Sequence, residues 1–150
     1  MTRINVGIPP VKLIDQHLIA EYRELPRVAT LVRKRIEKKQ GFEDIPPVFS
    51  LNKGHMLFFA DKGEYLFKRW VDIRNEMDRR GFKSKWAVQF EVYDEYHLSA
   101  LYNDYIPTQR DTDIMIERLT SVILNRFKSI PRYYSKQVTK EQATQILIND

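Results

Sequence analysis

The apolar positions of this chain recur every three or four residues in four segments, which is the spacing of an amphipathic helix. The first segment spans residues 12–40 and the second spans residues 63–80. Each is followed directly by a glycine, Gly41 and Gly81. Because glycine is favoured just beyond a helix end, the two glycines mark the expected ends of the two helices.

The third and fourth segments carry recognisable helix starts. The third opens after Pro107, with Thr108 and Asp111 as candidate caps. Its apolar stripe consists of Met115, Leu119 and Val122. The fourth begins at residues 139–142, Thr-Lys-Glu-Gln, which is the pattern of a capping box. The pattern therefore predicts two further helices, of which the last is short.

Two connections between these segments lack helical spacing. Residues 42–61 contain Pro46-Pro47 and an apolar run at 48–51 that suits an extended stretch. Residues 82–107 form a longer connection than a compact domain usually leaves unstructured, and their many aromatic residues predict packing against the helices. The predicted fold is all-α: a single compact domain, residues 1–150, of three main helices plus a short C-terminal helix, with long irregular connections. Residues 139–150 are expected to be a C-terminal extension of it.

Composition narrows the class of protein. A chain of 150 residues with 43% hydrophobic residues is long enough for one sizeable core. No apolar run approaches the roughly 20 residues of a membrane span, and the first residues show no signal-peptide pattern. The chain has no cysteine, which excludes disulfides and thiolate nucleophiles. We therefore expect a cytoplasmic protein.

The net charge of +5 is concentrated at one end of the chain. Residues 1–40 hold nine Lys or Arg and four Asp or Glu, whereas the other 110 residues are balanced. A basic region on a neutral body suits a polyanionic partner such as a nucleic acid. The alternative from charge alone is an ordinary solvated helix surface.

Candidate chemistry lies on the polar face of the first predicted helix. On an ideal helical wheel this face collects Gln16, His17, Ala20, Arg23, Glu24 and Arg27. The opposite, buried stripe collects Leu18, Tyr22, Leu25, Ala29, Val32 and Ile36. The polar face thus presents one carboxylate between two arginines, and the small Ala20 side chain leaves room for a ligand.

Pro26 interrupts the backbone hydrogen bonding of this helix beside Glu24. Proline has no N–H to donate to the Tyr22 carbonyl, so a kink or break is expected there. The alternative reading is two shorter helices in which Glu24 merely pairs with Arg23 or Arg27.

The same residues carry a resemblance to a known family. Residues 1–5, 15–18 and 20–28 resemble the N-terminus of the pyrimidine-dimer DNA glycosylases (endonuclease V) of T-even bacteriophages. The string Glu-Tyr-Arg-Glu-Leu-Pro-Arg at 21–27 is the most specific part. Weaker matches follow in order at Gly54-His55, Phe58-Phe59, Asp61-Lys62, Lys68-Arg69, 80–82, 104–107, Arg118-Leu119 and Tyr133-Tyr134, so the resemblance covers nearly all but the last dozen residues.

The resemblance implies a cofactor-free, metal-free DNA repair enzyme. In the family the α-amine of the second residue, here Thr2 after removal of Met1, is the nucleophile that forms an imine, and β-elimination then cuts the strand. An α-amine has a pKa near 7.7–8.0 against about 10.4 for lysine, so more of it is free base at neutral pH. Glu24 matches the family's catalytic carboxylate. The implied partner is double-stranded DNA carrying a pyrimidine dimer, bound by a monomer, in the host bacterial cytoplasm if the protein is phage-encoded.

The resemblance also implies a set of DNA-binding residues. Arg3, Arg23, Arg27 and Arg118 match positions that hold phosphates and the lesion strand, and Gln16, His17 and Tyr22 line the same site. Near the C-terminus we assign Arg132, Tyr133, Tyr134 and Lys136 to DNA binding. For the basic clusters at 33–35 and 38–39 the resemblance favours phosphate contact over a plain solvated face. The family is reported to flip the base opposite the dimer.

Two departures from the family pattern leave alternatives open. The segment 5–15 is one residue longer and contains Pro9-Pro10, so the chemistry requires it to bulge away from the site. Residues 130–132, Ile-Pro-Arg, replace an aromatic cluster. One alternative is therefore a glycosylase for a different modified base, and another is a non-catalytic nucleic-acid-binding module. The three histidines have no metal-ligand spacing, and Gly54-His55 reads as a turn packed on the core.

Overall fold

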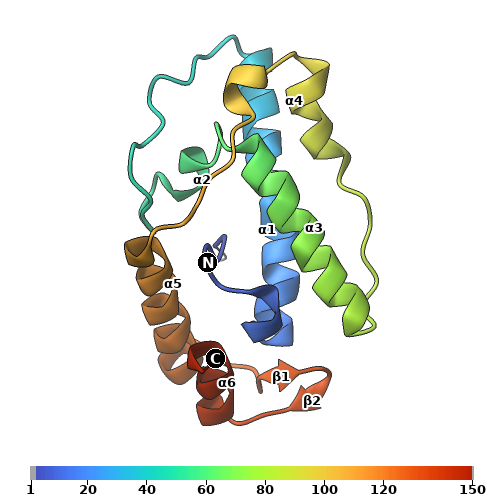
Figure 1. Cartoon of the computed structure of the whole chain (residues 1–150), viewed down its shortest axis with the longest axis vertical. Coiled ribbons are helices and arrows are strands. Elements are labelled where there is room, and N and C mark those ends of the chain that lie inside the picture. Colours follow the sequence, from blue (N-terminus) through green and yellow to red (C-terminus); the bar gives the residue numbers. More distant parts are fainter. Residues whose placement is uncertain (1–2, 150) are drawn as a thin grey trace.

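The computed structural model describes residues 3–149, and it is mostly helical. The long helices are α1 (Asp15–Glu37), α3 (Gly63–Arg79), α5 (Gln109–Ser121) and α6 (Lys140–Ile148), and the single-turn helices are α2 (His55–Phe58) and α4 (Val92–Glu95) (Figure 1). Three 3-10 turns lie at Pro10–Lys12, Val88–Glu91 and Ser99–Leu101, and a π-helical turn at Val122–Arg126 continues α5. Strands β1 (Arg132–Tyr133) and β2 (Lys136–Gln137) pair antiparallel. The all-α prediction is confirmed, apart from this small hairpin.

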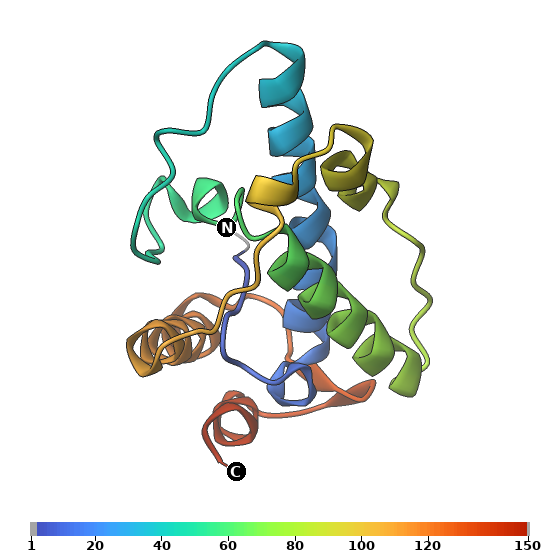
Figure 2. The ribbon, with the colours of Figure 1, turned by 45° about the horizontal axis from the view of Figure 1, so that its top comes forward.

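The N-terminal segment 3–14 runs between α1 and α5, as both ribbon views show (Figures 1 and 2). Its apolar side chains at Ile4, Val6 and Ile8 are fully buried. α1 occupies the middle of the molecule and packs against α3. Segment 3–14 is therefore part of the core, between the two helices that carry most of the predicted site.

The helix ends follow local chemistry. α1 ends at Glu37, earlier than Gly41, because Lys39 takes a left-handed conformation with φ of 57° and its N–H caps the Ile36 carbonyl. α3 ends as predicted at Gly81, whose φ is 80°. The predicted capping boxes at the starts of α5 and α6 are both formed.

α1 buries more of its surface than the wheel predicts. Leu18, Leu25, Ala29 and Val32 are buried as expected, but so are acidic residues outside the apolar stripe, namely Asp15, Glu21 and Glu24. The helical wheel predicts burial from the apolar residues of one helix alone, whereas in the structure segment 3–14 covers a second side of α1. The helix runs unbroken through Pro26, so the reading of two shorter helices is wrong.

The connections are more ordered than their sequences suggest. Residues 55–58, within the stretch interpreted as irregular, form α2. In the 82–107 connection Phe90 and Tyr93 are buried, as predicted, while Trp86 is half exposed. The Pro9-Pro10 stretch lies against the C-terminal end of α3, where the Arg80 guanidinium donates to the Pro10 and Val11 carbonyls at 3.3 Å each.

Candidate functional site

Glu24 lies in the middle of α1 with its side chain only 9% exposed. Its carboxylate is 3.5 Å from the guanidinium of Arg27, one turn along the helix. The Arg27 side chain is 70% exposed. Arg23, on the same turn, is also exposed. Exposed arginine side chains of this kind can form bidentate hydrogen bonds with a phosphate. Thr2, the predicted nucleophile, lies outside the described residues.

The backbone that follows residue 2 is held from two directions. The N–H of Ile4 donates to Nε2 of His55 at 3.0 Å, and the Arg3 guanidinium donates to the Leu51 carbonyl at 3.1 Å. Ile4 and His55 are both buried. The start of the described chain is therefore fixed against the loop that precedes α2.

A buried ion pair fixes the next residues of the N-terminal segment. The Glu21 carboxylate accepts from Asn5 at 2.8 Å and from Arg69 at 2.6 and 3.0 Å, and Arg69 also donates to the Ile8 carbonyl at 2.7 Å. Burial opposes the charge of Arg69, but the Glu21 carboxylate outweighs it and raises the pKa of that guanidinium. Removing one member of such a pair leaves a buried charge and typically costs about 3–5 kcal/mol. Segment 3–14 is thus joined firmly to both α1 and α3.

A cavity of about 260 Å³, which we call the arginine pocket, opens between α1, α5 and the N-terminal segment. It is lined by Arg3, Asn5, His17, Ala20, Arg118, Leu119, Val122, Arg126 and Phe127. Burial and the nearby charges of Arg3 and Arg126 lower the pKa of Arg118. Burial, with a smaller contribution from Arg118, lowers the pKa of His17 to about 4. The positive charge of the pocket therefore comes from its three arginines, while His17 is neutral at neutral pH.

Glu24 stands one helical turn beyond Ala20, which lines this pocket. Residues four apart on a helix share a face, so Glu24 follows Ala20 along the face of α1 that lines the arginine pocket. Clustered guanidinium groups repel one another, and an anion such as a phosphate relieves that repulsion with bidentate hydrogen bonds. The arrangement suits a phosphate in the pocket with a carboxylate next to it.

A second cavity, of about 300 Å³, opens on the side of α1 that carries Arg23 and Arg27, and we call it the tryptophan cavity. It is lined by Tyr22, Arg23, Pro26, Arg27, Thr30, Trp70, Lys85, Trp86, Ala87 and Gln89. Tyr22 stacks on Trp70 at 6.2 Å between ring centroids. Its hydroxyl accepts from the Lys85 N–H at 2.7 Å. Trp70 is fully buried, yet its indole N–H has no hydrogen-bond partner among residues 3–149. Such an unpaired donor calls for an explanation.

Gln16 and Asp15 hold the β1–β2 hairpin to the start of α1. The Gln16 side chain donates to the Ile130 carbonyl at 2.8 Å and accepts from the Arg132 N–H at 3.1 Å. Asp15 accepts from the backbone N–H groups of the turn residues 134 and 135 at 3.0 and 2.8 Å. Both turn residues, Tyr134 and Ser135, have positive φ, of 52° and 68°. Left-handed non-glycine residues need such support, so Asp15 stabilises a strained turn.

The two hairpin tyrosines are engaged within the protein. Tyr133 donates to the Val11 carbonyl at 2.7 Å and Tyr134 donates to the Glu76 carboxylate at 2.6 Å. Their rings flank the Arg80 guanidinium at 4.8 and 4.7 Å. The exposed cations of the hairpin are Arg132 and Lys136.

Apart from Glu24 and Thr2, the predicted residues fall into three groups. Arg3, His17 and Arg118 line the arginine pocket; Tyr22, Arg23 and Arg27 line the tryptophan cavity; Gln16, Arg132, Tyr133, Tyr134 and Lys136 form or support the hairpin. Sequence reasoning missed Arg126, Trp70 and the contact of His55 with Ile4. In the sequence Trp70 is only one of the regularly spaced apolar residues of segment 63–80, and Arg126 belongs to no motif.

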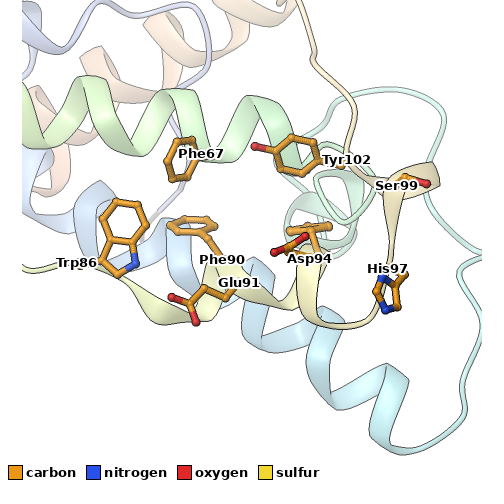
Figure 3. A pocket seen from close by; sticks show the side chains of 9 residues that line it. Phe67, Trp86, Phe90, Glu91, Asp94, His97, Ser99 and Tyr102 are labelled. Atoms are coloured by element: carbon orange, nitrogen blue, oxygen red, sulfur yellow. The ribbon is translucent and has the colours of Figure 1, made fainter.

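A larger cavity, of about 650 Å³, lies between α3 and the 86–102 connection. Figure 3 shows its aromatic walls, Phe67, Phe90 and Tyr102 among them, together with the carboxylates of Glu91 and Asp94. Carboxylates repel phosphates, so this cavity is not suited to a nucleic-acid backbone. Within residues 3–149 no three His, Asp or Glu side chains gather as metal ligands, and no helix there has the length and hydropathy of a membrane span.

Comparison with known protein families identifies the family of this chain. The family model described as pyrimidine dimer DNA glycosylase matches residues 1–89, more than half of the chain. The matched part contains segment 3–14, α1, α2 and α3, and with them Glu24, His17 and the whole lining of the tryptophan cavity. The chain belongs to the pyrimidine dimer DNA glycosylase family.

Proposed function

We propose that this glycosylase excises pyrimidine dimers through an imine between the sugar and the α-amine of Thr2, and that it then cuts the strand as an abasic-site lyase. The observation that supports the proposal is the burial of the Glu24 carboxylate, one helical turn beyond Ala20 of the arginine pocket and on the helix against which the N-terminal segment packs. We further propose that the protein acts as a monomer without a cofactor.

The proposed reaction has two halves. The amine nitrogen of Thr2 forms a bond to C1′ while the glycosidic bond breaks, and the departing base keeps the electron pair and takes a proton from water. The Glu24 carboxylate stabilises the positive charge that develops on the sugar. The C1′–O4′ bond of the sugar then breaks as O4′ takes a proton from the nitrogen, which leaves an open-chain protonated imine. Glu24 removes a C2′ proton from this imine, the C3′–O bond breaks, and the 3′ phosphate leaves. Water hydrolyses the imine and restores the amine.

Damaged DNA would occupy the cavities on both sides of Glu24. Phosphates of the lesion strand fit the arginine pocket, which Arg3, Arg118 and Arg126 line. Enzymes that act on a base must unstack the duplex at the target, and an extruded base needs an aromatic site to receive it. The tryptophan cavity offers the rings of Tyr22, Trp70 and Trp86. Trp86 is half exposed, so its ring is open to a base.

Borohydride reduction tests the proposal, because it converts an imine into a stable covalent adduct. The full chain, with Met1 removed, is incubated with a thymine-dimer duplex or an abasic duplex and the reductant. We expect an adduct with both, and strand cleavage without reductant. Binding without any adduct would support a non-catalytic DNA-binding module instead. An adduct with abasic DNA but no excision of the dimer, followed by excision of another damaged base from a panel of lesions, would support a different lesion specificity.

A further inference from the structure

His55 uses both ring nitrogens in a way that ties the N-terminal segment to α2. Its Nδ1 lies 2.9 Å from the Ser50 carbonyl, and its Nε2 accepts from the Ile4 N–H at 3.0 Å. A carbonyl only accepts and an N–H only donates, so Nδ1 carries the hydrogen and Nε2 is the acceptor. The two partners therefore select one neutral tautomer of the imidazole.

The surroundings of His55 keep it in that form. The ring is packed edge-on against Phe49 and Phe59, with centroids 5.5 and 5.4 Å away. Burial lowers the pKa of His55 to about 4, and the nearby charges of Arg3 and Arg118 act in the same direction. A protonated ring would direct an N–H at the Ile4 N–H and lose the contact. At neutral pH the acceptor is thus permanently available.

The contact made by His55 lies close to the proposed nucleophile. Ile4 is only two residues from Thr2, and each residue of chain spans at most about 3.3–3.6 Å, so chain length alone keeps the α-amine within a few residue lengths of the contact at Ile4. The loop that carries Ser50 also accepts from the Arg3 guanidinium, through the Leu51 carbonyl at 3.1 Å. The backbone of residue 4 and the side chain of residue 3 are therefore held by residues 50–55.

We propose that His55 is a positioning residue for catalysis: its imidazole holds the Ile4 N–H and thereby aims the N-terminal amine at the sugar. This inference rests on the proposed amine mechanism. A purely structural ring at this core position needs no acceptor nitrogen, since a phenylalanine fills similar volume without the cost of burying polar atoms. His55 instead offers an acceptor nitrogen to Ile4, two residues from the proposed nucleophile.

Two substitutions separate the acceptor from the ring. His55→Asn keeps an amide nitrogen near the position of Nδ1, for the Ser50 carbonyl, but has no atom at the position of Nε2. His55→Gln extends an amide oxygen towards that position and can accept from Ile4. Both lose the aromatic ring to the same degree, so they are matched in packing. Leu147→Ala, in α6, removes buried core volume from a different helix and serves as the control for lost stability.

The experiment measures the single-turnover rate of borohydride trapping on an abasic duplex at saturating protein, together with duplex affinity and urea unfolding. We expect His55→Asn to trap about tenfold or more slowly, with duplex affinity within about twofold, because small displacements of a reacting group are costly. His55→Gln should recover most of the rate, and Leu147→Ala should trap normally while it remains folded. If the folded His55→Asn variant traps as fast as the wild type, or if all three variants are slowed equally, the proposed role of His55 is wrong. Absence of any adduct in the wild type would instead refute the amine mechanism itself.

Discussion

Moderate acid should destabilise the folded protein well before its carboxylates become protonated. His55 has an ordinary pKa of 6.5 in the unfolded chain, and burial lowers it to about 4 in the fold. Between these two pH values His55 binds a proton in the unfolded chain but stays neutral in the folded protein. The free energy of unfolding therefore falls as the pH drops below about 6.5 and levels off near about 4.

The size of the effect follows from the pKa difference. Each pH unit below 6.5 costs about 1.4 kcal/mol for a group that stays neutral in the fold, so His55 alone removes about 2 kcal/mol of stability at about pH 5. His17, whose pKa is also lowered to about 4, adds a smaller loss because it is partly exposed. Glu76 and Asp111 also have lowered pKa values, but their contributions are lost only below their ordinary values of 4.5 and 3.8.

Urea unfolding followed by tryptophan fluorescence measures this loss. Wild type and His55→Gln are unfolded at about pH 7 and about pH 5. The glutamine variant has no proton to take up at this position, so its stability should change by about 2 kcal/mol less than that of the wild type. If both proteins lose the same stability between the two pH values, the account of a neutral, buried His55 is wrong. A titration midpoint for His55 near 6.5 in the folded protein would contradict it equally.

Three further predictions concern the DNA site. Glu24→Gln keeps shape and hydrogen bonding but removes the carboxylate, so strand cleavage should fall about 10²–10⁴-fold with intact folding and DNA binding, and near-normal cleavage would exclude the assigned role. Arg126→Ala should reduce the slope of log affinity against log salt by about 0.9 if the side chain neutralises one phosphate, whereas an unchanged slope would place it outside the interface. Trp86→Ala removes the half-exposed ring of the tryptophan cavity and should weaken binding of a dimer duplex about fivefold or more, the lower value of one base–aromatic stack, with undamaged duplex unaffected; equal weakening of both would point to a packing effect.

The helices could be predicted from the sequence because their signals are local. Apolar spacing, the glycine at position 81 and the capping residues at 108 and 139 each act within a few residues, and all three predictions are confirmed. α2 was missed because a single turn has too few residues for a periodic pattern. The β1–β2 hairpin was missed because its turn, Tyr134-Ser135, has no glycine and depends on Asp15, more than a hundred residues earlier in the chain.

The site could be predicted only as far as one helix carries it. The wheel placed Glu24 with Arg27, but it could not show that Glu21 on the same helix is buried in an ion pair with Arg69 of α3. Nor could it distinguish a tyrosine that lines a cavity, such as Tyr22, from one that braces the fold, such as Tyr134. These distinctions depend on contacts between residues far apart in sequence.

The mechanism is tested most directly by the site of the covalent bond to DNA. The processed chain is trapped with borohydride on dimer-containing duplex, digested with protease, and mapped by mass spectrometry. The account predicts a single modified peptide, with the deoxyribose remnant on the α-amine of Thr2, and no adduct when that amine is acetylated or Met1 is retained. An adduct on an internal lysine, or cleavage of the strand without any adduct, would contradict it.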